Sequence, residues 1–342
     1  MIEIDGSHGE GGGQLVRTAV ALSALTGRPL RLHNVRAGRA RPGLAAQHLA
    51  AVRAVAALCD ARCEGLEPRA GAFTFEPRSR PAGGELRVDV GTAGSVTLVL
   101  QALLPVLLAA RGPSRVVVTG GTDVRQAPCW DYFCEVLLRL LGRMQVRVRA
   151  SIARRGYYPR GGGEVCLEVE PGVPGPLVLQ KPALSWNITG NAYVANLPLT
   201  IAERMRDAAC AALGREAAID TRVLNGVQAA GTGGAITVWA ECDAGLLGAS
   251  RVAERGVRAE TLGAAAGQEL AADIASGATL DTHAADQVLV YLAIARGSSS
   301  ITVRTVSSHA RAAMWLIPQF LAARFAVEEE GALSRIRVEH GA

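Results

Sequence analysis

One order of helices and strands recurs three times along this chain of 342 residues, and it constrains the fold more than any other feature. Each copy reads as a helix, a strand, a polar loop, a second helix and then two strands. Apolar residues recur at helical spacing in the helices, and β-branched residues fill the strands. Repeated units of this kind bury their apolar faces against one another. We therefore expect an α+β fold built from three repeated units, each with helices and a four-stranded sheet.

The three copies differ in length but keep the same order of elements. In the first copy we expect helices at 14–25 and 44–59, and strands at 30–35, near 62 and at 73–75. In the second copy we expect helices at 96–109 and 129–141, and strands at 115–119, 145–150 and 163–169. In the third copy we expect helices within 282–297 and at 311–321, and strands within 299–306 and at 324–329 and 334–338.

Extra chain separates the second copy from the third. It begins near the stretch EPGVPGPL, whose Pro and Gly content is typical of a domain edge. The elements expected beyond that edge are, in order, a strand within 184–197, a helix at 201–213 and a strand at 235–242. We interpret residues 181–278 as an inserted α+β domain, and residues 1–180 and 279–342 as the larger domain of three units.

In every copy, unusual polar residues lie on the loop that follows the strand between the two helices. These residues are Arg36, Arg39 and Arg41 in the first copy, Thr122 and Asp123 in the second, and Ser307, Ser308 and His309 in the third. Binding and catalytic groups commonly lie on loops that a rigid scaffold holds in place. We expect these loops to form a shared site between the units.

The chain begins with a strand, a glycine loop and a helix, in the stretch EIDGSHGEGGGQLVRTAVALSAL. Backbone N–H groups and the helix dipole make such a loop a cradle for phosphate, yet the carboxylate of Glu10 lies in its middle. We expect Glu10, Gln14 and Arg17 to lie near one another at the start of the helix. Arg17 is the only charge in an otherwise apolar helix, so it either has a partner there or belongs to a solvated first turn.

Two further features favour chemistry on an anion. Arg36, Arg39 and Arg41 lie within six residues of one another, between glycines and a proline. Their planar guanidinium groups suit an anion better than an ordinary surface loop does. His309 lies between a strand and a helix, beside two serines, where an exposed imidazole is available as a nucleophile or base. The alternative for His309 is a structural histidine.

Composition and spacing exclude several classes of protein. No apolar run reaches the roughly 18 residues that a membrane span requires. Seven cysteines without a CxxC pair are typical of reduced thiols in a cytoplasmic protein. The net charge of +5 is carried by arginine, because Lys181 is the only lysine, and it permits a nucleic-acid partner.

Known catalytic motifs also fail at specific positions. Gln14 occupies the third glycine position of a dinucleotide-binding motif, and the serine hydrolase elbow is absent. Cys134 is wrongly spaced from Cys129 for a zinc deaminase.

Seven motifs occur in order along nearly the whole chain: GEGGGQLVRTA, RAGRARPGLAAQHL, GTAGSVTLVLQ, GGTD, RGYYPRGGGEV, ADQ and SSHA. Together they resemble the RNA 3′-terminal phosphate cyclases. The stretch RGYYPRGGG fits the family's signature of Arg or His, Gly, two free positions, Pro, one free position and three Gly. The resemblance implies three repeated units plus an inserted domain. It also implies an enzyme that uses ATP to convert an RNA 3′-phosphate into a 2′,3′-cyclic phosphodiester through a histidine–AMP intermediate.

The resemblance assigns roles to individual residues. His309 matches the histidine that receives AMP, with Arg39 and Arg17 as further catalytic residues. The residues implied to bind the nucleotide are Gln101, Pro128, His283, Ala284, Ala285, Asp286 and Gln287. Those implied to contact phosphate or RNA are Gln14, Arg36, Arg41 and Gln47. Glu10 is implied to hold a divalent cation, Mg²⁺ or Mn²⁺, which explains a carboxylate in a phosphate cradle.

Two alternative functions remain open from the sequence. Ribosome-maturation relatives of the cyclases do not cyclise RNA and lack the nucleophilic histidine, so His309 argues against them. An enolpyruvyl-transfer enzyme has a similar repeated fold and needs no such histidine. The expected partners are ATP and an RNA with a 3′-terminal phosphate, in the cytoplasm and without a membrane, and the pattern specifies no oligomeric state. Because every candidate residue lies outside 181–278, we expect the nucleotide step to need no part of the insert.

Overall fold

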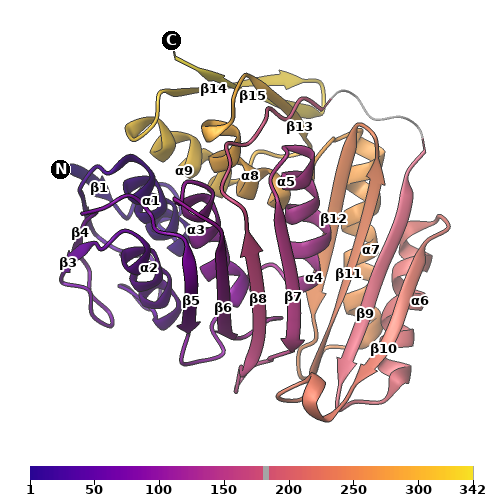
Figure 1. Cartoon of the computed structure of the whole chain (residues 1–342). Coiled ribbons are helices and arrows are strands. Elements are labelled where there is room, and N and C mark those ends of the chain that lie inside the picture. The colour runs from indigo at the N-terminus through magenta and orange to yellow at the C-terminus, as the bar shows by residue number, and fades with distance from the viewer. Residues whose placement is uncertain (180–184, 342) are drawn as a thin grey trace.

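The computed structural model describes residues 1–179 and 185–341, which form four β-sheets and the helices that cover them (Figure 1). Three of the sheets belong to the repeated units and the fourth belongs to the insert. None of the helices in these residues combines the length and apolar character that a membrane crossing requires. All seven cysteines are free thiols, as the spacing predicts.

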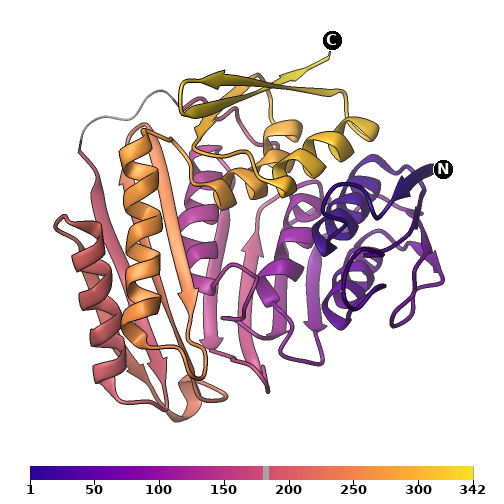
Figure 2. The same cartoon turned by 180° about the vertical axis from the view of Figure 1, so that it is seen from behind.

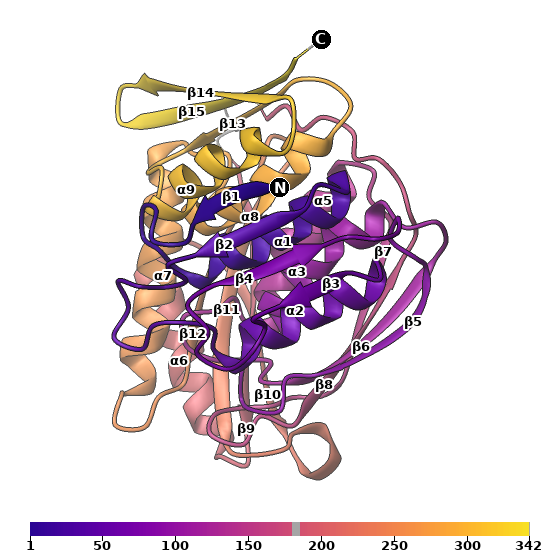
Figure 3. The same ribbon diagram turned by 90° about the vertical axis from the view of Figure 1, so that its left-hand side faces the viewer.

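The first unit has four strands in the order β1-β2-β4-β3 (Figure 3). Its elements are β1 (Ile2–Asp5), α1 (Gly13–Thr26), β2 (Leu30–His33), α2 (Ala46–Leu58), β3 (Arg62–Glu64) and β4 (Phe73–Glu76). Strand β1 runs parallel to β2, which pairs antiparallel with β4. Helix α1 ends at Gly27, whose φ of 68° is the left-handed conformation that glycine adopts without a steric penalty.

The second unit repeats this topology with the strand order β5-β6-β8-β7. Its elements are β5 (Gly84–Asp89), α3 (Val96–Leu108), β6 (Ser114–Gly120), α4 (Trp130–Tyr132), α5 (Arg139–Arg143), β7 (Val148–Arg154) and β8 (Gly163–Val169). The helix expected at 129–141 is present, but its middle, Phe133–Leu138, is π-helical. Helix α3 is apolar except for Thr97 and Gln101, and most of it is buried in the core.

The third unit contains a three-stranded sheet in the order β13-β15-β14. Its elements are α8 (Thr282–Ile294), β13 (Ser299–Val303), α9 (Ser308–Leu316), β14 (Ala323–Glu330) and β15 (Leu333–His340). Val178 forms a parallel bridge with Ser300, in the place that β1 and β5 take beside β2 and β6. The described sheet of this unit thus has three strands in place of the expected four, with Val178 forming only a bridge where the fourth would lie. That segment precedes the insert, which therefore interrupts the third unit instead of standing between the second and third.

The insert has its own sheet, in the order β10-β9-β11-β12, with two helices on one face (Figure 2). Its elements are β9 (Asn187–Ala195), α6 (Leu199–Leu213), β10 (Ala218–Leu224), β11 (Gly233–Cys242), β12 (Gly245–Val252) and α7 (Ala259–Ser276). It also has its own hydrophobic core. The expected boundary at residues 180 and 181, with Lys181, lies outside the described residues, and the division into two domains stays a prediction.

The helices of the three units meet in the centre of the larger part of the molecule. Helix α1 packs on α3 and α9, and α8 packs on α3 and α9. The three sheets lie around these helices, so that one continuous core connects the units (Figures 1 and 3). The contact between α1 and α9 brings together the two loops that precede these helices, from opposite ends of the sequence.

Candidate active site

Glu10 joins the first unit to the third. Its Oε1 accepts a hydrogen bond from Nη2 of Arg39, and its Oε2 accepts one from Oγ of Ser308 at 3.0 Å. Nε2 of His309 lies 3.1 Å from the same Oε2. Burial alone would raise the pKa of Glu10, but Arg39, His309 and Ser308 together hold it below its ordinary value. The structure thus gathers an ionised carboxylate, an arginine and a histidine from segments about 300 residues apart.

His309 lies in the first turn of α9, where the helix dipole favours a negative charge nearby. Burial lowers the pKa of its imidazole; Glu10 opposes this shift, and Arg17 and Arg39 add to it. A pKa below the ordinary 6.5 leaves the ring neutral at pH 7. The neutral ring is the form that can act as a nucleophile.

Asp286, implied by the resemblance to bind the nucleotide, supports the start of α9. Its Oδ1 accepts a hydrogen bond from Oγ of Ser307 at 2.5 Å, and that Oγ accepts from N of Ala310 at 2.9 Å. Ser307 is therefore the N-cap of the helix that carries His309. Burial raises the pKa of Asp286 to about 6. The carboxylate therefore helps to fix the start of α9, and a contact of Asp286 with the nucleotide stays a prediction.

Arg17 is a buried cation close to this cluster. Its exposed fraction is 8%, and burial lowers its pKa to about 10, so it stays charged at pH 7. No carboxylate within residues 1–179 and 185–341 forms an ion pair with it. The solvated first turn considered from the sequence is thus wrong. A buried guanidinium without an anion is costly, and a bound anion would offset that cost.

His48 lies beneath the glycine loop, and it is not among the site residues predicted from the sequence. Its Nδ1 accepts a hydrogen bond from N of Ala45 at 3.1 Å, and its Nε2 would stand 2.0 Å from a Cβ at Gly13. Burial, followed by Arg17 and Arg36, lowers the pKa of His48 to about 3, so its ring is neutral. Only glycine fits above it, which explains the residue type at position 13. The one signal in the sequence is its place in the stretch RAGRARPGLAAQHL.

The remaining residues of the first loop are held by backbone contacts. Arg36, with a φ of 53°, donates from Nη1 to the carbonyl oxygens of Arg41 at 3.0 Å and Gly43 at 2.8 Å. Its guanidinium thus shapes the loop. Oε1 of Gln47, at the start of α2, accepts from N of Ser95 at 3.2 Å and ties the start of this helix to the second unit. The side chain of Arg41 is exposed. Contacts of Arg36, Arg41 and Gln47 with phosphate or RNA stay predictions.

Three of the expected nucleotide residues form a chain of hydrogen bonds between α3 and α8. Gln101 donates from Nε2 to Oε1 of Gln287 at 2.5 Å, and Gln287 donates from Nε2 to the carbonyl oxygen of His283 at 2.8 Å. The carbonyl oxygen of Pro128 accepts from Thr97, also on α3, at 2.8 Å. The side chain of His283 is exposed beside this chain.

Three other candidates do not face an open site. The methyl groups of Ala284 and Ala285 are buried in the core, so a contact of these two residues with the nucleotide would use their backbone, and it stays a prediction. Gln14 lies against Ala312 and Leu316 of α9, and its Oε1 is buried with no hydrogen-bond partner among the described residues. A role of Gln14 toward phosphate or RNA stays a prediction.

The loop of the second unit faces the insert. Asp123 is fully buried and accepts hydrogen bonds from Nη1 of Arg155 at 3.1 and 3.2 Å. Nη2 of Arg155 donates to Asp131 at 2.7 Å, and its guanidinium lies 4.6 Å from the ring centroid of Tyr193 in β9. Thr122 donates to Asp123 at 2.7 Å. The charged side chain of this loop, Asp123, is therefore already paired within the protein.

A divalent cation would find one protein ligand at this site. Residues 1–179 and 185–341 contain no cluster of three or more His, Cys, Asp or Glu side chains that could hold a metal ion. Glu10 nevertheless offers a partly exposed carboxylate beside the glycine loop. Magnesium at nucleotide sites is commonly held by one or two carboxylates together with substrate phosphates and water. The donor at Glu10 fits an ion of that kind, with phosphate and water as its other ligands.

Comparison with known proteins identifies one family. Residues 8–327 match the family model described as RNA 3′-terminal phosphate cyclase. Proteins of that name are 52% identical in Nitrosospira multiformis, over 99% of this chain and 97% of theirs, and 44% identical in Methanopyrus kandleri, over 94% and 93%. The solved structure of the enolpyruvyl transferase NikO from Streptomyces tendae aligns over 98% of this chain and 48% of its own, with a TM-score of 0.40 and 13% identity. A likeness that slight carries no argument about function.

Proposed function

The chain belongs to the RNA 3′-terminal phosphate cyclase family, and we propose that it uses ATP to convert an RNA 3′-terminal phosphate into a 2′,3′-cyclic phosphodiester. One observation carries the proposal for the chemistry. A neutral imidazole, His309, lies at a helix N-terminus beside Glu10 and near two guanidinium groups, and one of these, Arg17, is buried with no ion-pair partner among the described residues. The α-phosphate of ATP is the anion that this arrangement is suited to receive.

In the first step, His309 attacks the α-phosphorus of ATP. A P–N bond forms, the bond to the β-phosphate oxygen breaks, and pyrophosphate leaves. Arg39 and Arg17 stabilise the negative charge that develops on the α-phosphate oxygens. The carboxylate of Glu10, 3.1 Å from the ring nitrogen, stabilises the positive charge that the imidazole gains.

In the second step, an oxygen of the RNA 3′-phosphate attacks the phosphorus of the bound AMP and the P–N bond breaks. The RNA now ends in a phosphoanhydride with AMP. In the third step, the adjacent 2′-hydroxyl attacks the RNA phosphorus, its proton passes to solvent, and AMP leaves. Because this last attack is intramolecular, proximity supplies much of its rate.

A divalent cation, Mg²⁺ or Mn²⁺, belongs to this proposal as a partner of ATP. When bound, it would neutralise charge on the phosphates. Among the described residues, Glu10 would hold it. Arg39 and His309 contact the same carboxylate, so they would share it with the ion.

The test is labelling with ATP that carries the isotope at the α or the γ position. We expect the protein to retain α-label and no γ-label, in a bond that acid breaks and alkali leaves intact, as for a phosphoramidate. RNA with a 3′-phosphate should release the label as AMP, whereas RNA with a 2′-deoxy end should stop at the AMP-capped stage. A ribosome-maturation relative or an enolpyruvyl-transfer enzyme would retain no label.

A further inference from the structure

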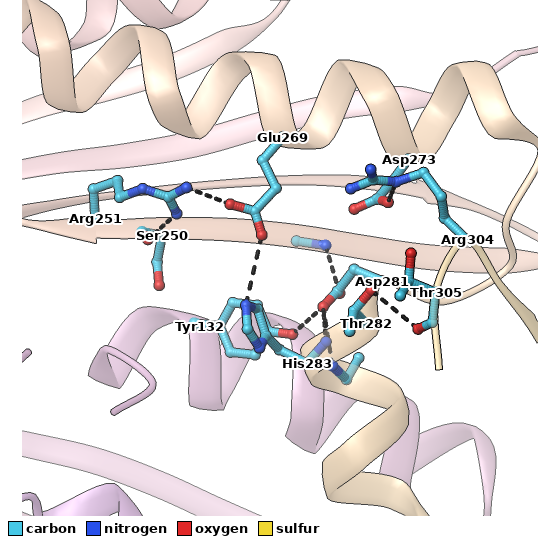
Figure 4. A network of polar contacts seen from close by, with 12 residues as sticks. Tyr132, Ser250, Arg251, Glu269, Asp273, Asp281, Thr282, His283, Arg304 and Thr305 are labelled. Carbon is cyan, nitrogen blue, oxygen red and sulfur yellow. Dashed lines mark hydrogen bonds and ion pairs between the residues drawn. The ribbon is translucent and has the colours of Figure 1, made fainter. Parts of the chain in front are cut away.

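Strand β12 and helix α7 of the insert contact the start of α8, where the nucleotide candidates lie (Figure 4). Asp281 is the N-cap of α8, and its Oδ1 accepts from N of His283 at 3.0 Å and from the hydroxyl of Tyr132 at 2.6 Å. Its Oδ2 accepts from N of Gly248 in β12 at 2.9 Å. The buried carboxylate of Asp281 thus fixes the first turn of α8 against the insert.

A second line of polar contacts leads from the insert to the side chain of His283. Oε1 of Glu269, on α7, lies 3.6 Å from Nε2 of His283, and Oε2 of Glu269 accepts from Nη2 of Arg251. Arg251 is itself fixed by a bond from Nη1 to the carbonyl oxygen of Ser250 at 2.8 Å. Figure 4 shows Glu269 between Arg251 and His283. The side chain of Glu269 is 20% exposed and that of His283 is 61% exposed. The contacts therefore lead from a mostly buried carboxylate to an exposed imidazole.

The physical effect of this contact is orientation. An exposed imidazole loses rotamer freedom when it binds a ligand, and that loss weakens binding. Exposed ion pairs contribute little to folding, about 0–1 kcal/mol, so the contact between Glu269 and His283 has small value as a stabilising bond. A carboxylate that Arg251 already holds can limit the rotation of the ring before a ligand arrives.

We propose that Glu269 is a positioning residue for the nucleotide, and that it holds the ring of His283 in one orientation at the proposed nucleotide site. This inference rests on the proposed function. It makes the insert a part of the nucleotide site, in contrast to the expectation from the sequence that the nucleotide step needs no part of it. A phenyl ring at position 283 has no polar nitrogen, so its orientation would not depend on Glu269.

The test is a double-mutant cycle on the single-turnover rate of AMP loading, measured against ATP concentration. Glu269→Gln should raise the half-saturating ATP concentration by about two- to tenfold, the equivalent of ordering one side chain, and leave the maximal rate unchanged. In a chain that carries His283→Phe, the same substitution should have no effect. Glu260→Gln is the matched control, because Glu260 lies on the same helix and pairs with exposed Arg204 at 2.6 Å.

Other results would contradict the inference or indicate a different role for Glu269. An equal rise in both backgrounds would mean that Glu269 does not act through His283, and it would overturn the inference. No rise relative to the Glu260→Gln chain would overturn it too. A loss of maximal rate together with a lower thermal midpoint would indicate a structural role in place of positioning. If the unaltered chain retains no α-label, the proposed function itself fails, and this inference fails with it.

Discussion

The loops after β2, β6 and β13 occupy equivalent positions in the three units, yet their charged residues have different surroundings. In the first and third units these residues meet at Glu10, and the side chains of Arg39 and His309 are 38% and 40% exposed. In the second unit the corresponding Asp123 is fully buried against Arg155.

Loops at equivalent positions in the fold are therefore suited to two different roles. Charges that stay partly solvated can exchange their partners for a ligand at little cost, as catalysis requires. Charges that are buried and fully paired cannot exchange, because an uncompensated charge in the interior costs several kcal/mol. Two of the loops are thus suited to chemistry, and the loop of the second unit is suited to fix the insert through Arg155 and Tyr193.

The largest effect should come from the loop of the third unit. His309→Asn should reduce labelling by α-labelled ATP to background, because no other group in the proposed mechanism forms the bond to AMP. The thermal midpoint should change little, since the side chain is partly exposed. His340→Asn, on exposed residue 340 of β15, is the matched control. Peptide mapping that places AMP on another residue would contradict the assignment.

The next largest effect should come from the loop of the second unit, on stability. Arg155→Met leaves two buried carboxylates without their cation and should lower the free energy of unfolding by about 3–5 kcal/mol. The molecules that remain folded should still load AMP. Adding Asp123→Asn and Asp131→Asn removes the uncompensated charge and should restore part of the stability. Denaturant unfolding measures both changes, and an Arg155→Met chain as stable as the original would contradict this reading of the loop.

In the loop of the first unit we expect a large effect on the rate of AMP loading and a small effect on stability. Arg39→Gln should slow AMP loading by about 10²-fold, because a preorganised donor to the developing charge is lost. Its effect on unfolding should stay below about 1 kcal/mol, as for other exposed ion pairs. Arg41→Gln, on the same loop, should change the loading rate far less. Equal losses for the two arginines would mean that the loop acts through its overall charge.

The smallest expected effect is on the pH profile. Burial lowers the pKa of His309 below 6.5, so the ring loses its proton at a lower pH than an ordinary histidine. The single-turnover loading rate should therefore be constant between about pH 8 and pH 7 and fall only below about pH 6.5. A profile whose half-maximal rate lies above that value would show that the ring is protonated more easily than the structure indicates.

The fold was largely predictable from the sequence because local patterns determine it. Apolar spacing and turn residues mark most elements of the three units, and the equivalent loops with Arg39 and His309 follow from them. Helix α7 gave a weaker signal, since it contains Gly263 and Gly267. A Cβ at Gly263 would stand 2.0 Å from the carbonyl oxygen of Met205 in α6, so these glycines allow the two helices to pack closely.

The partners of buried polar residues could not be predicted in the same way. Arg155 pairs with Asp123 and Asp131, and Glu269 contacts His283, through approaches that only the tertiary fold creates. The local sequence does not indicate which carboxylates pair with Arg155, or which imidazole contacts Glu269. His48 illustrates the same limit, because its neutral state depends on burial beside Arg17 and Arg36.

The position of the insert within the third unit has a consequence for the order of folding. N of Leu177 donates to Oγ of Ser299 at 3.1 Å, across 122 residues of chain. The first two units close over much shorter separations, so their loop-closure entropy is smaller. During synthesis at about 5–20 residues per second, residues 177–179 emerge roughly 6–24 s before β13 can pair with them. The unit that carries His309 can thus close only after the chain of the first two units and of the insert has been synthesised.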